Sequence, residues 1–248
     1  MQRVELLAVP GLPMIKAGDD LAGLIGEQLK GDLALRPGDV VVLAQKIVSK
    51  AEGRLVEIAS VKPSQRAIEL GAEVQKDPRL VELILSESVR VVRSRPNVLI
   101  VEHRLGFVMA NAGIDQSNVA PQDGVERALL LPRDPDASAE ALRARLGATA
   151  LLIIDSFGRP WRRGTTGVAI GAAGLPSMLD LRGNPDLFGR ILQVSISAFA
   201  DEIAAAASLV MGQGDEAQPV VLVRGLTWKA PANPASELVR PATEDLFR

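Results

Sequence analysis

Residues 89–110 read VRVVRSRPNVLIVEHRLGFVMA, and this stretch decides between the fold classes open to the chain. It holds short segments rich in Val, Ile and Leu at residues 89–92, 98–102 and 106–110, and the connections between them are too short for a helix. Strands that follow one another so closely pair as antiparallel neighbours, whereas parallel strands need a long crossover. The stretch therefore predicts a mixed α+β protein and not a regular doubly wound sheet.

Elsewhere, strand and helix patterns alternate irregularly, and we find no internal repeat. Apolar runs predict further strands at residues 4–9, 40–44, 150–154, 168–173 and 220–223, with 47–48 as a candidate extension of the second. Helical spacing of apolar residues predicts helices at residues 20–30, 64–75, 79–87, 138–146 and 196–211. The expected fold is α+β, with mixed, largely antiparallel sheets and helices.

The length of 248 residues suits one large domain or two small ones. We expect residues 1–228 to form one domain with room for two lobes. Residues 229–248 contain several prolines and charged side chains, which predicts a loosely held C-terminal tail.

Composition excludes several kinds of chemistry. The 28 Lys and Arg nearly balance the 30 Asp and Glu, so charge gives no support for nucleic-acid or membrane binding. The chain has no Cys and one His, which excludes thiolate metal sites and a multi-His site within one chain. His103 itself is expected to be a structural or surface residue. The remaining carboxylates, amides, hydroxyls, Lys and Arg suit a hard divalent cation and a phosphate.

The N-terminal residues 1–13 contain no long apolar run of the kind found in signal peptides. The longest apolar stretch, residues 203–211, is too short to span a bilayer. We therefore expect a cytoplasmic protein with neither membrane nor nucleic-acid partners.

The segment NAGIDQSN (111–118) directly follows a predicted strand. It gathers carboxylate, amide and hydroxyl oxygens, which are the ligands preferred by Mg²⁺ and Mn²⁺. The alternative is a loop in which Asn and Asp hydrogen-bond to their own turns.

The segment IIDSFGRPWRRGTTG (153–167) begins in a fully apolar strand that is expected to end at Asp155. Residues 156–167 then predict a loop, where Arg159, Arg162 and Arg163 supply planar donors for phosphate or carboxylate. The alternative is a solvated basic loop.

The third segment is MGQGDE (211–216), at the end of the helix that carries Asp201 and Glu202. Its turn could offer side-chain oxygens and backbone N–H groups to a nucleotide, although acidic pairs on helices usually face solvent. The chain has no P-loop sequence, and the G-x-G-x-x-A pattern at 212–217 follows a helix instead of a strand, which argues against a dinucleotide fingerprint.

Together, these and other segments resemble the coenzyme F420-0:γ-glutamyl ligase family. They occur in the family's order and are GLPMI (11–15), GDDL (18–21), GDVVV (38–42), VSKAEG (48–53), NAGIDQSN (111–118), DSFGRPWR (155–162), ADEI (200–203), MGQ (211–213) and VRG (223–225). The blocks at 111–118 and 155–162 are the most specific.

The resemblance implies a GTP-dependent ligase that adds L-glutamate to coenzyme F420-0, and then further γ-linked glutamates, in coenzyme F420 biosynthesis. The reaction would pass through an acyl phosphate. The implied fold is two-lobed and forms an intertwined homodimer. Two alternatives stay open: a nucleotide-dependent carboxylate–amine ligase with another acceptor, and a nucleotide-binding homologue without turnover.

The resemblance also implies site residues. Two divalent ions, Mg²⁺ or Mn²⁺, are expected on Asp115, Asp155, Ser156 and Gln213, and a requirement for K⁺ is left open. The expected nucleotide-binding residues are Leu12, Pro13, Met14, Ile15, Gln45, Lys46, Lys50, Asn118, Met211, Gly212, Gln213 and Gly214. Phosphoryl transfer needs charge neutralisation and alignment, so the expected catalytic residues are Asp115, Asp155, Lys50, Arg159 and Arg162.

Two positions depart from the family's pattern. Ser156 stands where Thr is common, which keeps the hydroxyl oxygen. Gln45 and Lys46 stand where other members often have a Ser/Thr-type pair, so the choice between GTP and ATP stays open.

Overall fold

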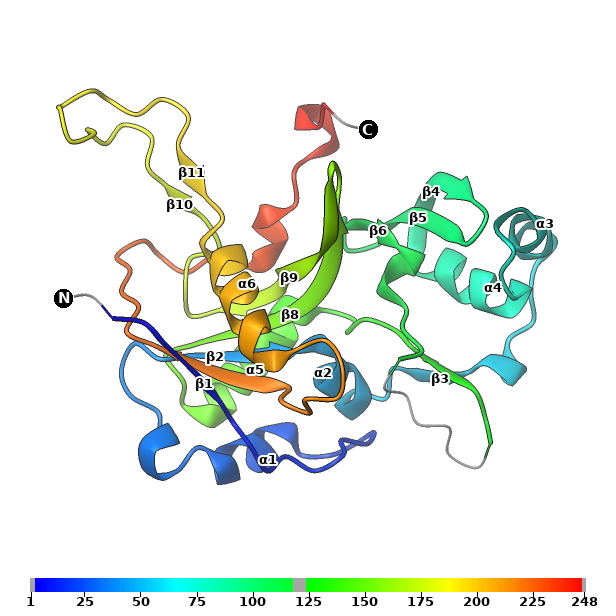
Figure 1. Cartoon of the computed structure of the whole chain (residues 1–248), viewed down its shortest axis with the longest axis horizontal. Coiled ribbons are helices and arrows are strands. Elements are labelled where there is room, and N and C mark those ends of the chain that lie inside the picture. Colours follow the sequence, from blue (N-terminus) through cyan, green and yellow to red (C-terminus); the bar gives the residue numbers. More distant parts are fainter. Residues whose placement is uncertain (1–2, 118–123, 247–248) are drawn as a thin grey trace.

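A five-stranded sheet forms the centre of the molecule (Figure 1), in a computed structural model that describes residues 3–117 and 124–246. The strands in spatial order are β1 (Glu5–Ala8), β12 (Val220–Arg224), β2 (Val40–Ala44), β8 (Ala150–Arg159) and β9 (Arg162–Ala173). Strands β2 and β8 pair in parallel, and the other neighbours pair antiparallel. Strands β1, β2 and β8 therefore run in the same direction, and their carboxyl ends lie at one end of the sheet.

Helices cover both faces of this sheet. One face packs against α1 (Leu21–Gln28), α2 (Gln45–Ala51) and α5 (Pro135–Leu146), and the other packs against α6 (Phe199–Met211). Successive side chains of a strand point to opposite faces of the sheet, so alternate residues belong to different cores. In β2, Val41 and Leu43 belong to the first core, whereas Val40 and Val42 belong to the second.

A second lobe lies beside the sheet and has its own buried core (Figure 1). Its helices and strands are α3 (Gln65–Val74), α4 (Pro78–Ser86), β4 (Ser88–Arg95), β5 (Val98–His103) and β6 (Val108–Ala110). Strands β4, β5 and β6 pair antiparallel in chain order, as the stretch 89–110 predicts. Strands β3 (Leu55–Glu57) and β7 (Arg127–Leu129) form an antiparallel pair between the lobes. The α+β prediction is confirmed.

Most of the predicted helices begin at identifiable caps. The side chains of Asp20, Ser64, Asp77 and Asp134 accept hydrogen bonds from backbone N–H groups in the first turns of α1, α3, α4 and α5. Gly147 ends α5 in the left-handed conformation. Short 3₁₀ turns complete the connections: η1 (Gly31–Leu33), η2 (Ile58–Ser60), η3 (Asn111–Gly113), η4 (Ala235–Leu238) and η5 (Ala242–Glu244).

A long arm projects from the body between β9 and α6 (Figure 1). Its base is the antiparallel pair β10 (Leu179–Asp180) and β11 (Ile196–Ser197). Beyond this pair, Leu187 and Phe188 are 98% and 94% exposed. They are the most exposed of the large apolar side chains among the described residues.

Two predictions around the end of the sheet are wrong. Residues 47–48 do not extend β2, because the chain turns into α2 directly after Ala44. Strand β8 does not end at Asp155, and residues 156–167 are not a loop: β8 and β9 continue as a twisted hairpin that turns at 160–161. The ladder with β9 supplies the backbone hydrogen bonds that a loop would have sought elsewhere.

The segment after Lys229 is held more firmly than its composition predicts. Asp136 accepts hydrogen bonds from the N–H groups of Ala235 and Ser236, and Asn233 Oδ1 accepts one from Ser177. Ala235 is fully buried against the core that contains α6. Among the described residues, no helix is long and apolar enough to cross a membrane.

Candidate active site at the end of the central sheet

A cavity of about 420 Å³ lies at the carboxyl ends of β1, β2 and β8. Each of these strands delivers a segment to its wall: residues 12–15 follow β1, residues 44–47 and Lys50 follow β2, and residues 154–156 belong to β8. Residues 211–219, between α6 and β12, form the remaining side. The crevice outside the carboxyl ends of strands is where open sheets commonly bind ligands.

The register of the sheet explains this convergence. Ala44 of β2 pairs with Ile154 of β8, so that the residues following each lie side by side. The N–H of Ala44 also donates to the carbonyl of Pro219 at 2.8 Å, which fixes the segment before β12 against the same point. Polar residues far apart in sequence are thereby brought to one wall.

Helix α6 closes the cavity from one face of the sheet. It lies so close to β9 that a Cβ at Gly167 would be 2.3 Å from the carbonyl oxygen of Ala204. Asp201 of the same helix accepts a hydrogen bond from the N–H of Ala169 at 2.9 Å. The register shift between Ile153 and Ile154 in the β8–β9 ladder lies beside this contact. Asp201 therefore has a structural role and is not among the residues that line the cavity.

Asp155 is a partly buried carboxylate on the cavity wall. Its Oδ1 accepts a hydrogen bond from the N–H of Ser156 at 2.8 Å. Burial, and to a smaller extent the charge of Asp115, raises the pKa of Asp155 to about 6, although Ser156 and the Lys46 ammonium act in the opposite direction. Perturbed carboxylates in cavities are candidates for functional groups.

Asp115 reaches the same place from the second lobe. It forms an isolated antiparallel bridge with Leu129, through two backbone hydrogen bonds of 2.8 and 3.0 Å. Just before it, Asn111, Ala112 and Gly113 all have positive φ, a conformation that costs free energy for residues other than Gly. A strained turn of this kind is common at functional sites, and here it directs the chain toward Lys46.

The Lys46 ammonium binds Asp115. Nζ lies 2.6 Å from Oδ2 of Asp115 and 2.8 Å from Oγ of Ser117. Burial alone would raise the pKa of Asp115, but Lys46 and Ser117 together hold it below its ordinary value. Burial lowers the pKa of Lys50, and the neighbouring charge of Lys46 lowers it further, against the opposite effect of Asp115. The charges of these lysines and of the two carboxylates, Asp115 and Asp155, therefore influence one another's pKa values.

Gln45 lies at the beginning of α2 and is 1% exposed. Its Oε1 accepts a hydrogen bond from Ser49 Oγ at 2.8 Å, while its Nε2 has no partner among the described residues. An unpaired buried amide costs free energy. The sequence alone does not indicate Ser49, because its i, i+4 relation to Gln45 exists only in a helix, and the apolar pattern predicts a strand extension at residues 47–48.

The turn after α6 presents backbone N–H groups at the cavity. The Glu216 carboxylate folds back over it and accepts a hydrogen bond from the Gly214 N–H at 2.8 Å. Gly212 has a φ of +72°, a backbone conformation that other residues rarely adopt, so Gly is favoured there. The backbone N–H groups of Glu216 and Gly214 lower the pKa of Glu216. The turn therefore already holds one carboxylate, which is the behaviour of an anion-binding backbone concavity.

The predicted residues are only partly brought together. Those that line the cavity are Leu12, Pro13, Met14, Ile15, Gln45, Lys46, Lys50, Asp155, Ser156, Met211, Gly212, Gln213 and Gly214. Asp115 joins them through Lys46. Arg159 and Arg162 lie at the exposed tip of the β8–β9 hairpin and are not among the lining residues. Asn118 lies outside the described residues.

His103, which the sequence analysis gives a structural role, lies in the second lobe. It is fully buried, and its Nδ1 accepts a hydrogen bond from the N–H of Leu105 at 3.0 Å. Its Nε2 lies 3.5 Å from Glu87 Oε2, in a cluster that also contains Arg54 and Arg104. The histidine is a core residue away from the cavity.

The cavity offers few side chains that could coordinate a metal ion. Among the described residues, no group of three or more His, Cys, Asp and Glu side chains could hold a metal ion. The two carboxylates of Asp115 and Asp155 interact with each other through space, with Lys46 as the cation bonded to Asp115. Two carboxylates with a hydroxyl and an amide fit a hard cation that takes its remaining ligands from phosphate and water.

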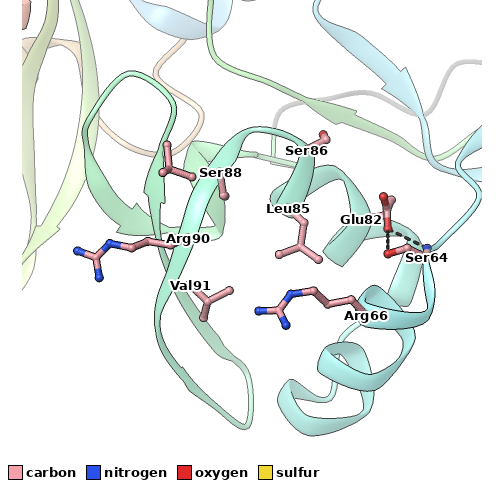
Figure 2. A pocket seen from close by; sticks show the side chains of 9 residues that line it. Ser64, Arg66, Glu82, Leu85, Ser86, Ser88, Arg90 and Val91 are labelled. Atoms are coloured by element: carbon pink, nitrogen blue, oxygen red, sulfur yellow. Dashed lines mark hydrogen bonds between the residues drawn. The ribbon is translucent and has the colours of Figure 1, made fainter.

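A second hollow of about 340 Å³ lies on the second lobe, between α3, α4 and β4 (Figure 2). Several of its polar groups are already engaged: Glu82 accepts hydrogen bonds from the N–H and Oγ of Ser64, and Arg90 pairs with Glu102. None of the buried polar atoms that lack a partner lies in it. This hollow shares no lining residue with the cavity at the end of the central sheet.

The fold and the cavity define an α+β protein with paired carboxylates and lysines at the carboxyl end of its sheet. Comparison with known proteins identifies its family. Residues 11–225 match the model of the family described as F420-0:Gamma-glutamyl ligase. The chain belongs to that family.

Similar proteins cover the whole length. The chain is 47% identical to the coenzyme F420:L-glutamate ligase of Methanothermobacter thermautotrophicus, over 99% of both chains. It is 44% identical to the protein of the same name from Methanopyrus kandleri, over 97% of this chain and 96% of that one. Its identity to the protein of that name from Methanocaldococcus jannaschii is 38%, over 100% and 98%.

Proposed function

We propose that this protein is a GTP-dependent ligase that adds L-glutamate to coenzyme F420-0, and then further γ-linked glutamates. The observation that carries the proposal is the pairing of Asp155 and Asp115 around Lys46 at the cavity. Full-length similarity to proteins named coenzyme F420:L-glutamate ligase supports the same reaction and acceptor.

The reaction requires activation of a carboxylate. The γ-phosphoryl group of GTP passes to a carboxylate oxygen of F420-0, so that the bond to the β-phosphate oxygen breaks and GDP leaves. The glutamate amine then attacks the acyl carbon, a C–N bond forms, the C–O bond breaks, and phosphate leaves. The amine loses its proton to solvent or a base. The products are amide, GDP and phosphate.

The cavity's own residues suit the phosphoryl step, which depends mainly on alignment and charge neutralisation. Lys46 and Lys50 would bind the nucleotide's phosphates, and the turn at residues 213–216 would orient them once its N–H groups exchange the Glu216 carboxylate for phosphate. Residues 12–15 would form the opposite wall, with Gln45 offering a polar contact. Arg159 and Arg162 would take part once the β8–β9 hairpin meets a bound ligand or a second chain.

The carboxylate site fits a divalent cation, because two neighbouring acidic groups face one bonded ammonium. Asp115, Asp155, Ser156 and Gln213 would hold two Mg²⁺ or Mn²⁺ ions. When bound, such ions neutralise phosphate charge and polarise the oxygens. K⁺ is a further candidate, to be tested by replacing it with Na⁺ in the assay.

A homodimer completes the proposal. The arm between β10 and β11 exposes Leu187, Phe188 and Val194 almost fully. A second copy of the chain that received this arm would remove these side chains from water. The family resemblance points to the same intertwined arrangement.

The decisive experiment incubates purified protein with GTP, Mn²⁺ or Mg²⁺, L-glutamate and F420-0, and measures product masses. One or more added glutamyl units with release of GDP are expected, and ATP in place of GTP should support much less. Asp155→Asn should abolish turnover, while Asp32→Asn, the same change at an exposed residue, should not. A protein that binds GTP but yields no glutamyl product would contradict the proposed acceptor.

A further inference from the structure

Both carboxylate oxygens of Asp115 accept hydrogen bonds, and Oδ2 accepts two. Oδ1 accepts a hydrogen bond from the Ser117 N–H at 2.6 Å. Oδ2 is bonded by the Lys46 ammonium at 2.6 Å and by Ser117 Oγ at 2.9 Å. A metal ion can bind Asp115 through Oδ2 only after the ammonium has moved.

Electrostatic repulsion also makes the Lys46 ammonium and a metal ion compete for Asp115. The Lys46 ammonium binds Asp115, and its positive charge and the negative charge of Asp115 both act on Asp155. A divalent ion beside them would lie close to that ammonium and repel it. In a half-buried place such as this, where the Lys46 side chain is 27% exposed, water screens the repulsion incompletely.

The Lys46 ammonium also has an alternative position, in the cavity. It lines the cavity together with Lys50 and the turn at residues 211–216. Its side chain is long and flexible, and it enters from the first turn of α2. A phosphate group in the cavity would therefore offer the ammonium an alternative partner.

We infer that Lys46 occupies the metal site until a nucleotide phosphate binds its ammonium, so that the nucleotide opens the Asp115–Asp155 pair to the divalent ion. This inference rests on the proposed function of the cavity. It assigns Lys46 two successive partners, Asp115 and then phosphate. Because coupling between two ligands is reciprocal, bound metal must also strengthen the binding of nucleotide.

The first test measures Mn²⁺ binding without nucleotide, from the electron paramagnetic resonance signal of free Mn²⁺. Lys46→Met should bind Mn²⁺ about tenfold more tightly than the unchanged protein, because the competing charge is gone. Lys46→Gln is a second uncharged variant, and Lys46→Arg should stay weak. Lys62→Met removes an exposed charge from the second lobe and should change nothing.

The outcomes separate this inference from the proposed function. If Lys46→Met and the unchanged protein bind Mn²⁺ equally, and Asp155→Asn removes that binding, the metal site stands and the role of Lys46 is overturned. If no variant shows Mn²⁺ binding that depends on Asp155, the metal site itself is overturned, and this inference with it.

The second test follows a fluorescent guanine nucleotide in the presence of chelator. Lys46→Met should bind it about tenfold more weakly than the unchanged protein, because the phosphate has lost its ammonium. Mn²⁺ should then strengthen nucleotide binding less in Lys46→Met than in the unchanged protein. Mn²⁺ also binds free nucleotide in solution, but this equilibrium is the same for the two proteins and cancels when their nucleotide affinities are compared. Equal affinities under chelation would overturn the proposed movement of Lys46.

Discussion

Arg224 forms a forked ion pair with Asp39 at the edge of the core. Its Nε and Nη2 donate to the two carboxylate oxygens at 3.0 and 2.8 Å, and Asp39 is 1% exposed. Arg224 also donates to the carbonyls of Asp32 and Ala34. The pair ties the end of β12 to the start of β2, and thereby fixes the strands that form the cavity.

Arg224→Ala should therefore destabilise the protein strongly. The variant leaves a buried carboxylate without its cation and two carbonyls without the Arg224 donor, and such a loss costs about 3–5 kcal/mol. Urea unfolding at pH 7 measures it. The control Arg3→Ala removes an exposed arginine, paired with Glu5, and should cost little. A loss below about 1 kcal/mol for Arg224→Ala would contradict the interpretation.

Gly167→Ala should destabilise the contact between β9 and α6. The added Cβ would lie 2.3 Å from the Ala204 carbonyl, so strand and helix must separate, at a cost of about 1–3 kcal/mol. Gly158→Ala is the matched control, because a Cβ there meets nothing within 4 Å. Denaturant midpoints of the two variants give the comparison. Equal midpoints would show that α6 does not press on β9.

Asp155→Asn should stabilise the metal-free protein at neutral pH while abolishing activity. The pKa of Asp155 is raised to about 6 in the folded state, so its ionised form opposes folding above that pH. The gain should be about 1–3 kcal/mol at pH 8 and should vanish as the pH falls from about 6 toward 4. Thermal unfolding in chelator, against the unchanged protein, measures it. A gain independent of pH would contradict the assignment.

Glu87 should give the opposite pH dependence. Burial alone would raise its pKa, but His103, Arg54 and Arg104 lower it to about 2. A depressed pKa stabilises the fold above pH 4.5, and this contribution is lost as the pH falls toward 2. Glu87→Gln should cost about 2–4 kcal/mol at pH 7 and remove much of the sensitivity to acid. Urea unfolding at pH 7 and pH 3 tests both parts.

Replacing Leu187 and Phe188 with Asp should prevent dimer formation. The two side chains are almost fully exposed in the single chain, so charges there should not disturb its fold. Light scattering after size-exclusion chromatography should report a dimer for the unchanged protein and a monomer for the variant. Arg190→Asp, at an exposed position on the same arm, is a control for charge alone. A monomeric unchanged protein would contradict the proposed homodimer.

The elements that could be predicted are those whose signals are local. The strands at 40–44 and 220–223 are continuous apolar runs, and the helix starts at Asp20 and Asp77 have side-chain caps. The stretch 89–110 shows its antiparallel pairing through its short connections. In each case, residues close together in the sequence are enough to determine the strand, the helix start or the strand pairing.

The remaining features depend on contacts between distant residues. Residues 156–167 have the composition of a loop, and become a hairpin because β9 supplies their partners. Asp115 and Asp155 could be proposed from their motifs, but nothing in the sequence links Lys46 to Asp115. That pair exists because β2 delivers Lys46 and the bridge at Leu129 delivers Asp115 to the same place.

The position of β12 has a consequence for how the protein is made. Strand β12, the last strand among the described residues, lies between β1 and β2, which leave the ribosome well before it. During synthesis, β1 has no neighbour to pair with until residues 220–224 emerge. The nascent chain therefore carries an open sheet, and the cavity cannot close until residues 220–224 have been made. Folding of the central sheet should be slow relative to that of the second lobe, whose pairings are local.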